Sequence, residues 1–388
     1  MRTRPGNKKE GKQAMAQQLR RALVTGGVGF IGTNLSAALL AAGSEVTVLD
    51  NFSRPGTRRN LAWLRRQAPP GRLQVIEGDV CHAGTVAAAV AGQQAIFHLA
   101  AQVAVTHALR DPRADFEVNL GGTLNVLEAA RAGGCRPLLL YTSTNKVYGA
   151  LPDAVQHPEG VSEQQPLDLH SPYGCSKGAA DQYVRDYGRS FGMSTVVFRM
   201  SCIYGPHQFG TEDQGWVAHF VLALRAGQTI TLYGDGRQVR DLLYVGDLVD
   251  AMMGAAALRP QGRVFNVGGG PRNAVSLLEL LRLLELRSGL RAELRYAPVR
   301  AGDQPYYVSN TQALEQALGW RPRTSVAAGL ARLWAWADDI TCAPLRTPVP
   351  PLLIKQPPVP HAARGDREPR GPVARGRRVS LCEDKVPA

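Results

Sequence analysis

The sequence predicts an α/β protein built on a doubly wound parallel sheet, followed by a smaller α/β lobe. Short apolar runs alternate with helical patterns over roughly the first half of the chain, which is typical of parallel strands joined by helices. These runs are continuously apolar, as in a sheet covered on both faces. A glycine-rich turn follows the first run directly. We therefore expect one large sheet whose strands all end at a common edge.

Six apolar runs are expected to form this sheet, at 21–25, 46–49, 73–77, 95–99, 138–142 and 195–199. The helix after the first run extends to Ala42, and Gly43 is expected to cap it. Beyond about residue 200, shorter elements punctuated by glycine and aromatic residues predict a second lobe over the carboxyl edge of the sheet. The expected strands and helices of this lobe are 229–233, 239–243, 264–267, 246–258, 276–286 and 326–338.

Both ends of the chain differ in composition from its body. Residues 1–20 carry six basic residues and one acidic residue, and residues 341–388 carry nine and four, so each end holds +5. About +3 of the formal +13 remains for the body, which is ordinary for an enzyme with anionic ligands. A specific nucleic-acid function is therefore not expected. We expect residues 1–20 to be a basic extension, with Met15 as an alternative start, and the Pro/Arg-rich residues 341–388 to be disordered.

Two further classes of protein are disfavoured by cysteine and hydropathy patterns. The six cysteines form no Cys-x-x-Cys pair and have no histidine at metal-ligand spacing, so no metal site is expected. No apolar run approaches the roughly 18 residues of a membrane span, and the first twenty residues contain no hydrophobic signal stretch. We expect a cytoplasmic protein with free thiols and no membrane partner.

The glycine-rich turn is expected to bind a dinucleotide. It reads Gly26-Gly27-Val28-Gly29-Phe30-Ile31-Gly32 and lies between a strand and a helix. Glycines let the backbone approach a pyrophosphate, and the helix N-terminus supplies N–H donors and a positive dipole end. Asp50 ends the second strand, where it can accept hydrogen bonds from both ribose hydroxyls. Because a carboxylate there repels a 2′-phosphate, we expect a Rossmann domain that prefers NAD to NADP, although Arg54 softens that preference.

Residues at other strand ends are expected to line the same site. Asp79, followed by Val80, either contacts the adenine or serves as a turn residue. The small residues of 99–102 let the backbone approach a dinucleotide, and His98 is expected to be packed and satisfied. Asn119 is expected to support the active-site backbone. The predicted cofactor-binding residues are Gly26, Gly29, Phe30, Ile31, Gly32, Asp50, Asn51, Ser53, Arg54, Asp79, Val80, Leu99, Ala100, Gln102, Asn119, Tyr173 and Lys177.

Thr144, Tyr173 and Lys177 predict catalysis at this site. A tyrosine hydroxyl has a pKa of about 10 and is a poor base at neutral pH. Lys177 lies four residues after Tyr173, on the same helix face, where its ammonium favours the phenolate and lowers the Tyr173 pKa. The Thr144 hydroxyl, at a neighbouring strand end, can hold a substrate alcohol beside the phenolate.

These motifs together resemble the extended short-chain dehydrogenase/reductase superfamily of nucleotide-sugar enzymes, over roughly residues 21–338. Longer blocks are similar to the CDP-paratose 2-epimerase family, also called the CDP-tyvelose epimerases. The blocks that carry this finer resemblance are 143–149 (STNKVYG), 170–183 (HSPYGCSKGAADQY), 213–216 (DQGW), 238–241 (QVRD), 50–54 (DNFSR) and 60–64 (NLAWL). Met200, Cys202, Ile203 and His207 depart from the pattern, which puts the choice of nucleotide and sugar in doubt.

The resemblance implies an NAD-binding domain over 21–200 and a mainly substrate-binding lobe over 201–340, interleaved with the first. It implies bound NAD, with Tyr173 taking a proton from a sugar hydroxyl, Thr144 holding the reacting oxygen, and Lys177 lowering the Tyr173 pKa and holding the nicotinamide ribose. The implied reaction oxidises C2 of CDP-paratose transiently and ends in inversion. A homodimer or homotetramer is also implied. The substrate-binding residues implied are Thr144, Gln208, Trp216, Arg240, Arg300 and Asp303.

Alternative functions remain open at this stage. Related 4,6-dehydratases carry an Asp-Glu pair directly after the catalytic Ser/Thr, whereas Asn145 and Lys146 follow Thr144 here, so elimination of water would lack its acid and base. A 4-epimerase acting on a UDP-hexose shares the catalytic trio and is the main alternative. A noncatalytic NAD-sensing or RNA-binding protein would be expected to have a broken active site, yet Thr144, Tyr173 and Lys177 are all present.

Overall fold

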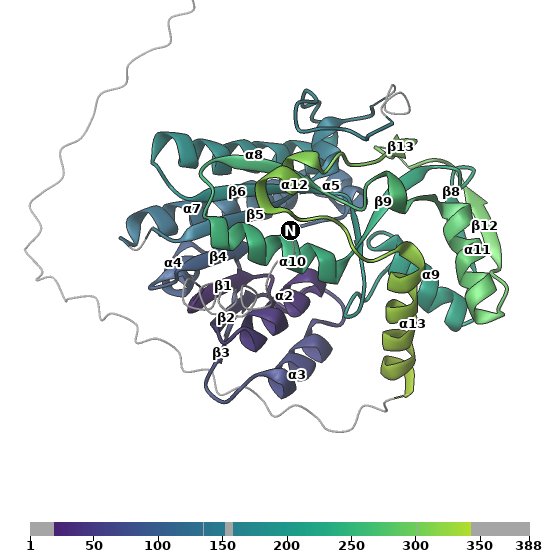
Figure 1. Cartoon of the computed structure of the whole chain (residues 1–388), viewed down its shortest axis with the longest axis horizontal. Coiled ribbons are helices and arrows are strands. Elements are labelled where there is room, and N and C mark those ends of the chain that lie inside the picture. The colour runs from purple at the N-terminus through teal and green to yellow at the C-terminus, as the bar shows by residue number, and fades with distance from the viewer. Residues whose placement is uncertain (1–18, 135, 152–157, 301, 343–388) are drawn as a thin grey trace, which may run out of the picture. The chain divides into compact units, whose positions relative to one another are not determined.

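The computed structural model describes residues 19–134, 136–151, 158–300 and 302–342, without side chains for 341 and 342. The predicted extension up to residue 18, the alternative start at Met15 and the predicted disordered tail from residue 343 lie outside the described residues. Figure 1 shows the arrangement of the elements.

A seven-stranded parallel sheet forms the centre, in the order β10-β6-β5-β4-β1-β2-β3. The strand order reverses between β1 and β4, which leaves a crevice at their carboxyl ends where ligands of such sheets bind. The predicted doubly wound α/β fold is confirmed. The strands are β1 (Arg21–Thr25), β2 (Glu45–Asp50), β3 (Leu73–Glu77), β4 (Ala95–His98), β5 (Leu138–Thr144), β6 (Thr195–Met200) and β10 (Arg263–Val267).

Helices cover both faces of this sheet. On one face, helices and strands form a hydrophobic core that includes Leu35, Leu39 and Met252. On the other face they form a core that includes Val126 and Val184. The helices of the first face are α2 (Phe30–Ala41), α3 (Thr57–Gln67), α10 (Val245–Leu258) and α12 (Gln312–Leu318). Those of the second are α4 (Ala83–Val90), α7 (Gly122–Ala132) and α8 (Ser171–Ser190). Burial on both faces explains why the strands read as continuous apolar runs.

A short helical segment links β4 to α7 and packs against α8. It consists of α5 (Val105–Arg110), α6 (Pro112–Phe116) and η1 (Glu117–Gly121). Asp111 caps α6 by accepting from the Ala114 N–H at 3.0 Å, and Pro112 occupies the first turn, where its missing N–H costs nothing. η1 is a π-helical turn, a rare conformation that is frequent at functional sites. A 3₁₀ turn, η2 (Asn145–Tyr148), follows β5 directly.

The second lobe has its own core around Val221, Leu280 and Leu333. β9 is the centre of a four-stranded sheet, and β8 and β12 form a separate parallel pair. Its strands are β7 (Cys202–Tyr204), β8 (Ile230–Tyr233), β9 (Val239–Tyr244), β11 (Ala274–Ser276), β12 (Leu294–Ala297) and β13 (Tyr306–Tyr307). Its helices are α9 (Trp216–Arg225), η4 (Pro271–Asn273), α11 (Leu277–Ser288) and α13 (Val326–Cys342).

β10 and α10 differ from the expected organisation, because the sequence assigned both runs to the second lobe. β10 is instead the edge strand of the main sheet beside β6, where Phe265 packs edge-on against Phe198 with ring centroids 6.4 Å apart. α10 packs on α2. An apolar run indicates the type of element but does not identify its neighbours, so the interleaving of the lobes could not be localised.

Among the described residues, no helix combines the length and apolar character that crossing a bilayer requires.

Candidate active site

A cavity of about 770 Å³ lies at the carboxyl edge of the main sheet. The glycine turn, the ends of β2, β3, β4 and β5, the first turns of α8 and segments of the second lobe all contribute to its walls. It therefore brings together residues far apart in the chain, as the topological reversal between β1 and β4 predicts. The predicted site residues on its walls are Gly26, Gly29, Phe30, Ile31, Gly32, Asp50, Asn51, Ser53, Arg54, Asp79, Val80, Leu99, Ala100, Gln102, Thr144, Tyr173, Lys177, Gln208, Trp216, Arg300 and Asp303.

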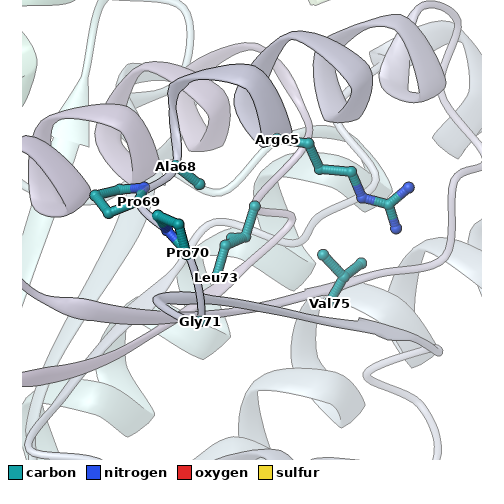
Figure 2. A pocket seen from close by; sticks show the side chains of 7 residues that line it. All are labelled: Arg65, Ala68, Pro69, Pro70, Gly71, Leu73 and Val75. Carbon is teal, nitrogen blue, oxygen red and sulfur yellow. The ribbon is translucent and has the colours of Figure 1, made fainter.

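A second, smaller hollow of about 300 Å³ lies where α3 leads into β3 (Figure 2). Its walls are Arg65, Ala68, Pro69, Pro70, Gly71, Leu73 and Val75. Arg65 is the single ionisable residue among these seven, so this hollow does not have the combination of groups that acid–base catalysis requires.

The glycine turn is shaped by close backbone contacts. Gly26 has φ +65°, and a Cβ there would lie 2.9 Å from the Ala100 nitrogen, while a Cβ on Gly32 would lie 2.1 Å from the Gly26 carbonyl oxygen. These positions therefore exclude any larger residue. A Cβ on Gly29 would meet within 4 Å nothing but the Gly26 oxygen at 3.1 Å, so space is left open beside the start of α2.

Asp50 holds this turn as well as lining the cavity. One carboxylate oxygen accepts from the Val28 N–H at 3.2 Å and the other from the Phe52 N–H at 2.9 Å. Burial raises the pKa of Asp50, and the backbone hydrogen bonds oppose that rise. Asn51 donates to Asp79 at 2.8 Å, and Asp79 also accepts from the Cys81 N–H at 2.9 Å. Asp79 thus acts as a turn residue and lies on the cavity wall at the same time.

Asn119 does not line the cavity, although it was predicted as a cofactor-binding residue. Its side chain lies behind Gln102, accepting from the Gln102 N–H at 3.0 Å and donating to the Gln102 carbonyl at 3.1 Å. It also donates to Asp115 and to Ser176, both at 3.1 Å. The expectation that Asn119 supports the active-site backbone agrees with this geometry. Direct contact with a cofactor does not, because Gln102 lies in front of it on the wall.

His98 is packed and satisfied, as expected. It is 1% exposed and its ring nitrogens lie 2.7 Å from the Thr25 hydroxyl and 3.0 Å from the Thr123 hydroxyl. Burial, and then the charge of Lys177, lowers the pKa of His98 to about 3. A neutral imidazole with both nitrogens bonded is a structural group.

Thr144, Tyr173 and Lys177 meet in this cavity, and all three are buried. Thr144 ends β5 and its hydroxyl accepts from the Lys146 N–H at 3.2 Å. The Thr144 hydroxyl donates to the Asn145 side-chain oxygen at 3.3 Å, and its proximity to the Tyr173 phenol acts to lower the Tyr173 pKa. Tyr173 and Lys177 project from one face of the first turns of α8, as their spacing predicts.

Tyr173 does not have the lowered pKa that its spacing from Lys177 predicts. Burial dominates and raises the pKa of Tyr173 to about 12. Burial also lowers the pKa of Lys177 to about 7, against the charges of Asp181 and Asp115. The Lys177 ammonium donates to the Thr142 carbonyl at 2.6 Å. A lysine that is only partly charged at neutral pH favours a phenolate less than a full ammonium does.

The second lobe contributes aromatic and cationic groups to the opposite wall. The Arg300 guanidinium stacks 3.6 Å over the Tyr233 ring and donates to the Glu212 carbonyl at 2.9 Å. The Trp216 indole N–H points at the Cys202 sulfur, 3.5 Å away. The Gln208 side-chain oxygen and the Ser143 hydroxyl are buried without a hydrogen-bond partner among the described residues. Both residues line the cavity, so a polar ligand can satisfy them.

Arg240, which was predicted to bind substrate, is not among the residues that line the cavity. It is 7% exposed on β9 and donates to the neighbouring Val239 carbonyl at 2.7 Å. Its charge nevertheless reaches the cavity, because it contributes to lowering the pKa of Lys146 and opposes the rise of the Cys202 pKa.

The sequence profile of the NAD dependent epimerase/dehydratase family matches residues 22–268. The chain belongs to this family. A CDP-paratose 2-epimerase of Salmonella typhi is 40% identical over 338 residues, which cover 82% of this chain and 99% of the relative. A UDP-glucose 4-epimerase of Mycolicibacterium smegmatis is 36% identical over 80% of this chain and 96% of its own. Among solved structures, Thermus thermophilus UDP-glucose 4-epimerase in complex with NAD has a TM-score of 0.72 and 35% identity, over 82% and 99% of the two chains.

Membership of the NAD dependent epimerase/dehydratase family confirms the predicted resemblance, the enzyme class and NAD as the cofactor. The cavity fits that cofactor. The glycine turn leaves open space at the start of α2, Asp50 lies at the end of β2, and Ser143 offers an unpartnered hydroxyl. The negative charge of Asp50, at the end of β2 where the ribose of a dinucleotide binds in such folds, agrees with the predicted preference for NAD.

Asn145 and Lys146 were not predicted as site residues, because in the sequence they indicated only that the acidic pair of the dehydratases is missing. Both nevertheless line the cavity. The Asn145 amide donates to Gln304 at 3.2 Å, and the Lys146 ammonium donates to the Gly302 carbonyl at 2.8 Å. Gln304 in turn donates to the Gly149 carbonyl. Their position directly after Thr144 was the signal that could have identified them as site residues.

Proposed function

We propose that this member of the NAD dependent epimerase/dehydratase family is a nucleotide-sugar epimerase that inverts C2 of CDP-paratose to give CDP-tyvelose. The observation that carries the proposal is the meeting of Thr144, Tyr173 and Lys177, all buried, in one cavity with the glycine turn. The 40% identity to a CDP-paratose 2-epimerase over nearly the whole relative supports the choice of substrate.

The catalytic trio divides the chemistry at one hydroxyl-bearing carbon. Bound NAD supplies a hydride acceptor that becomes a hydride donor once reduced. Tyr173 takes the proton from the reacting hydroxyl, and Thr144 holds that oxygen by a hydrogen bond. Lys177 carries an ammonium in a considerable share of molecules at neutral pH, since its pKa is about 7, and this charge favours the phenolate of Tyr173.

Inversion requires the oxidised sugar to present its other face before reduction. Tyr173 then returns the proton to the oxygen. The sugar thus regains both the proton and the hydride that it lost, and no second substrate is consumed. A cavity of about 770 Å³ is within the usual range for small-molecule sites. Buried but unpartnered groups, the Gln208 oxygen among them, offer hydrogen bonds to more than one orientation of the sugar.

A 4-epimerase that acts on a UDP-hexose is the second candidate. The likeness to two UDP-glucose 4-epimerases, at 36% and 35% identity, favours it. The catalytic trio itself does not distinguish the two reactions, because oxidation and reduction at either carbon need the same proton acceptor. A dehydratase is disfavoured, because Asn145 and Lys146 stand where elimination would need an acid and a base.

Product analysis by NMR separates these candidates. Purified protein is incubated in turn with CDP-paratose, UDP-glucose and dTDP-glucose, and the sugar ring protons are followed. We expect conversion of CDP-paratose to a mixture with CDP-tyvelose. Conversion of UDP-glucose to UDP-galactose alone would replace the C2 assignment with the second candidate, and formation of a 4-keto-6-deoxy sugar would identify a dehydratase.

We also propose that the enzyme works in the cytoplasm as a homodimer or homotetramer. Exposed apolar side chains gather on three helices that pack on one another, α5, α6 and α8, and their solvent exposure supports an interface between copies. They are Leu109 of α5 (48% exposed), Phe116 of α6 (49%) and Tyr183 of α8 (45%), and Phe191 (46%) follows the last residue of α8. Light scattering that gave a monomer mass would contradict the oligomer.

A further inference from the structure

Lysine is rare in the folded part of this enzyme. Between residues 19 and 342 the sequence contains two lysines, Lys146 and Lys177, while arginine supplies the other basic side chains apart from histidine. Both lysines line the cavity. Lys177 belongs to the catalytic trio, whereas no step of the proposed reaction uses Lys146. A compact ammonium at residue 146, in a chain that otherwise prefers arginine, indicates a local chemical need.

Lys146 contacts Thr144 through its backbone and the second lobe through its ammonium. Its backbone N–H donates to the Thr144 hydroxyl at 3.2 Å, so the two residues adjoin. Its ammonium donates to the Gly302 carbonyl at 2.8 Å and lies 3.7 Å from an Asp303 oxygen. An ammonium has three donors. The contact with Gly302 uses one, and the distance to Asp303 exceeds that of a good hydrogen bond, so donors remain for a ligand in the cavity.

The charges around Lys146 favour an anion. Burial, and then the charge of Arg240, lowers the pKa of Lys146 to about 8, against the opposing charge of Asp303. Cys202, the other titratable group near the ammonium, is buried and its pKa is raised, so the thiol is neutral at pH 7. Among the described residues, no carboxylate forms an ion pair with Arg240. Two cations and one carboxylate leave a positive excess that a phosphate would neutralise.

The chemistry of a nucleotide sugar links this charge to the carbon that reacts. The distal phosphate is bonded to the sugar through the oxygen on C1. The C2 oxygen lies four bonds from that phosphorus, whereas the C4 oxygen lies six bonds from it, across the ring. When C2 is the reacting carbon, the phosphate must therefore lie near Thr144, which holds the reacting oxygen. A cation on the side chain of Lys146, whose backbone contacts Thr144 and whose ammonium shares the cavity, suits inversion at C2 better than inversion at C4.

We propose that Lys146 binds the distal phosphate of the nucleotide sugar and thereby places C2, rather than a more distant carbon, beside Thr144 and Tyr173. This inference rests on the proposed function, because it takes C2 as the reacting carbon. Lys146 is a substrate-binding and specificity-determining residue in this account. Asn145, bonded to Gln304 beside it, is a positioning residue.

Calorimetry of the NAD-loaded protein with CDP and with CMP tests the phosphate contact, because the two ligands differ by the distal phosphate. In Lys146→Met, we expect the affinity for CDP to fall roughly tenfold, as for loss of a charge-assisted hydrogen bond, and the affinity for CMP to stay within about twofold. Arg65→Met is the matched control, because it also removes one positive charge but at the second hollow (Figure 2). It is expected to change neither the affinity for CDP nor that for CMP. Lys146→Gln replaces Lys146→Met if the latter does not retain NAD.

Equal weakening of CDP and CMP, or no change in either, would overturn the inference. Failure of the proposed function is seen separately, in the wild-type protein, as no conversion of CDP-paratose. A third outcome is that Lys146→Met loses affinity for CDP alone while the wild type inverts C4 of a UDP-sugar. In that case Lys146 does bind the phosphate, but the claim that it places C2 beside Thr144 and Tyr173 is wrong.

Discussion

Tyr173 is the residue on which the chemistry of the proposed reaction depends. Tyr173 is 7% exposed and lines the same cavity as Thr144, so the proposed proton acceptor and the group proposed to hold the substrate oxygen lie together before substrate arrives. Such placement is a large part of what general acid–base catalysis requires. The raised pKa of Tyr173, about 12, shows that burial by itself works against the phenolate, and that charge in the cavity has to oppose it.

Tyr173→Phe is expected to lower kcat roughly a thousandfold, as for loss of a general base, while NAD stays bound. Tyr183→Phe is the matched control, because Tyr183 lies on the same helix, is 45% exposed and does not line the cavity. Steady-state kinetics and the NAD content of both variants provide the check. A Tyr173→Phe protein that kept activity within about twofold of the wild type would remove Tyr173 from the mechanism.

Lys146 gives the enzyme a pH dependence with a definite sign. Its pKa is about 8, so the ammonium loses its charge as the pH rises through that value, and the attraction for the distal phosphate falls with it. Between about pH 7 and about pH 9.5 we expect the preference for CDP over CMP to drop severalfold in the wild type. In Lys146→Arg it is expected to stay level, because a guanidinium remains charged throughout. Calorimetry across this range provides the test, and parallel curves for both proteins would speak against a charge effect.

At the scale of elements, α8 carries the catalytic pair and is anchored by a buried ion pair. Asp181, one turn beyond Lys177, accepts from Arg199 of β6 at 2.8 and 3.0 Å, and the two side chains are 0% and 2% exposed. Arg199 also donates to the Tyr148 hydroxyl at 3.1 Å. The pair therefore fixes α8 against β6. Thr144 lies at the end of β5, the strand that pairs with β6.

Asp181→Asn is expected to lower the free energy of unfolding by about 3 kcal/mol, because it leaves the Arg199 charge buried and unpaired. Asp186→Asn on the same helix is the control, since Asp186 accepts from the exposed Ser190 hydroxyl and its loss should cost no more than about 0.5 kcal/mol. Urea denaturation with NAD present measures both. Equal costs for the two variants would mean that the buried pair does not anchor α8.

Elements with a strong local signal could be predicted, and those defined by their neighbours could not. The strands β1 (Arg21–Thr25) and β3 (Leu73–Glu77) were predicted with their observed bounds, because short apolar-rich runs between turn residues identify strands, whether buried as in β1 or at the sheet edge as in β3. The position of β10 at the sheet edge depends on which strand it pairs with, and periodicity carries no such information. The π-helical turn that presents Asn119 to Gln102 was equally invisible, because it arises from local packing.

The same division holds for the site. Gly26, Asp50 and Tyr173 could be predicted because their chemistry requires particular residue types at fixed spacings. Arg240 was expected to bind substrate, yet it is absent from the cavity lining and donates to the Val239 carbonyl, since a motif states which residue is present and not the direction of its side chain. Lys146 reaches Gly302, more than 150 positions away in the chain, and that contact exists only in the folded protein.

At the scale of the whole molecule, the two lobes divide the work. The main sheet and its helices supply the glycine turn, Asp50 and the proposed catalytic trio, and the second lobe contributes Gln208, Trp216 and Arg300 to the same cavity. Because both lobes contribute to one cavity, the nucleotide end of the substrate can be held while the sugar turns. This arrangement is what distinguishes inversion from a simple oxidation, which would release the oxidised sugar.

The central claim is that hydrogen leaves C2 of the sugar and returns to the same carbon on its opposite face. The most direct test uses CDP-paratose that carries deuterium at C2, converted in ordinary water and analysed by NMR and mass spectrometry. The account predicts CDP-tyvelose that retains the deuterium at C2, because Tyr173 exchanges only the proton of the hydroxyl. Deuterium lost to solvent, or inversion at a carbon other than C2, would contradict it.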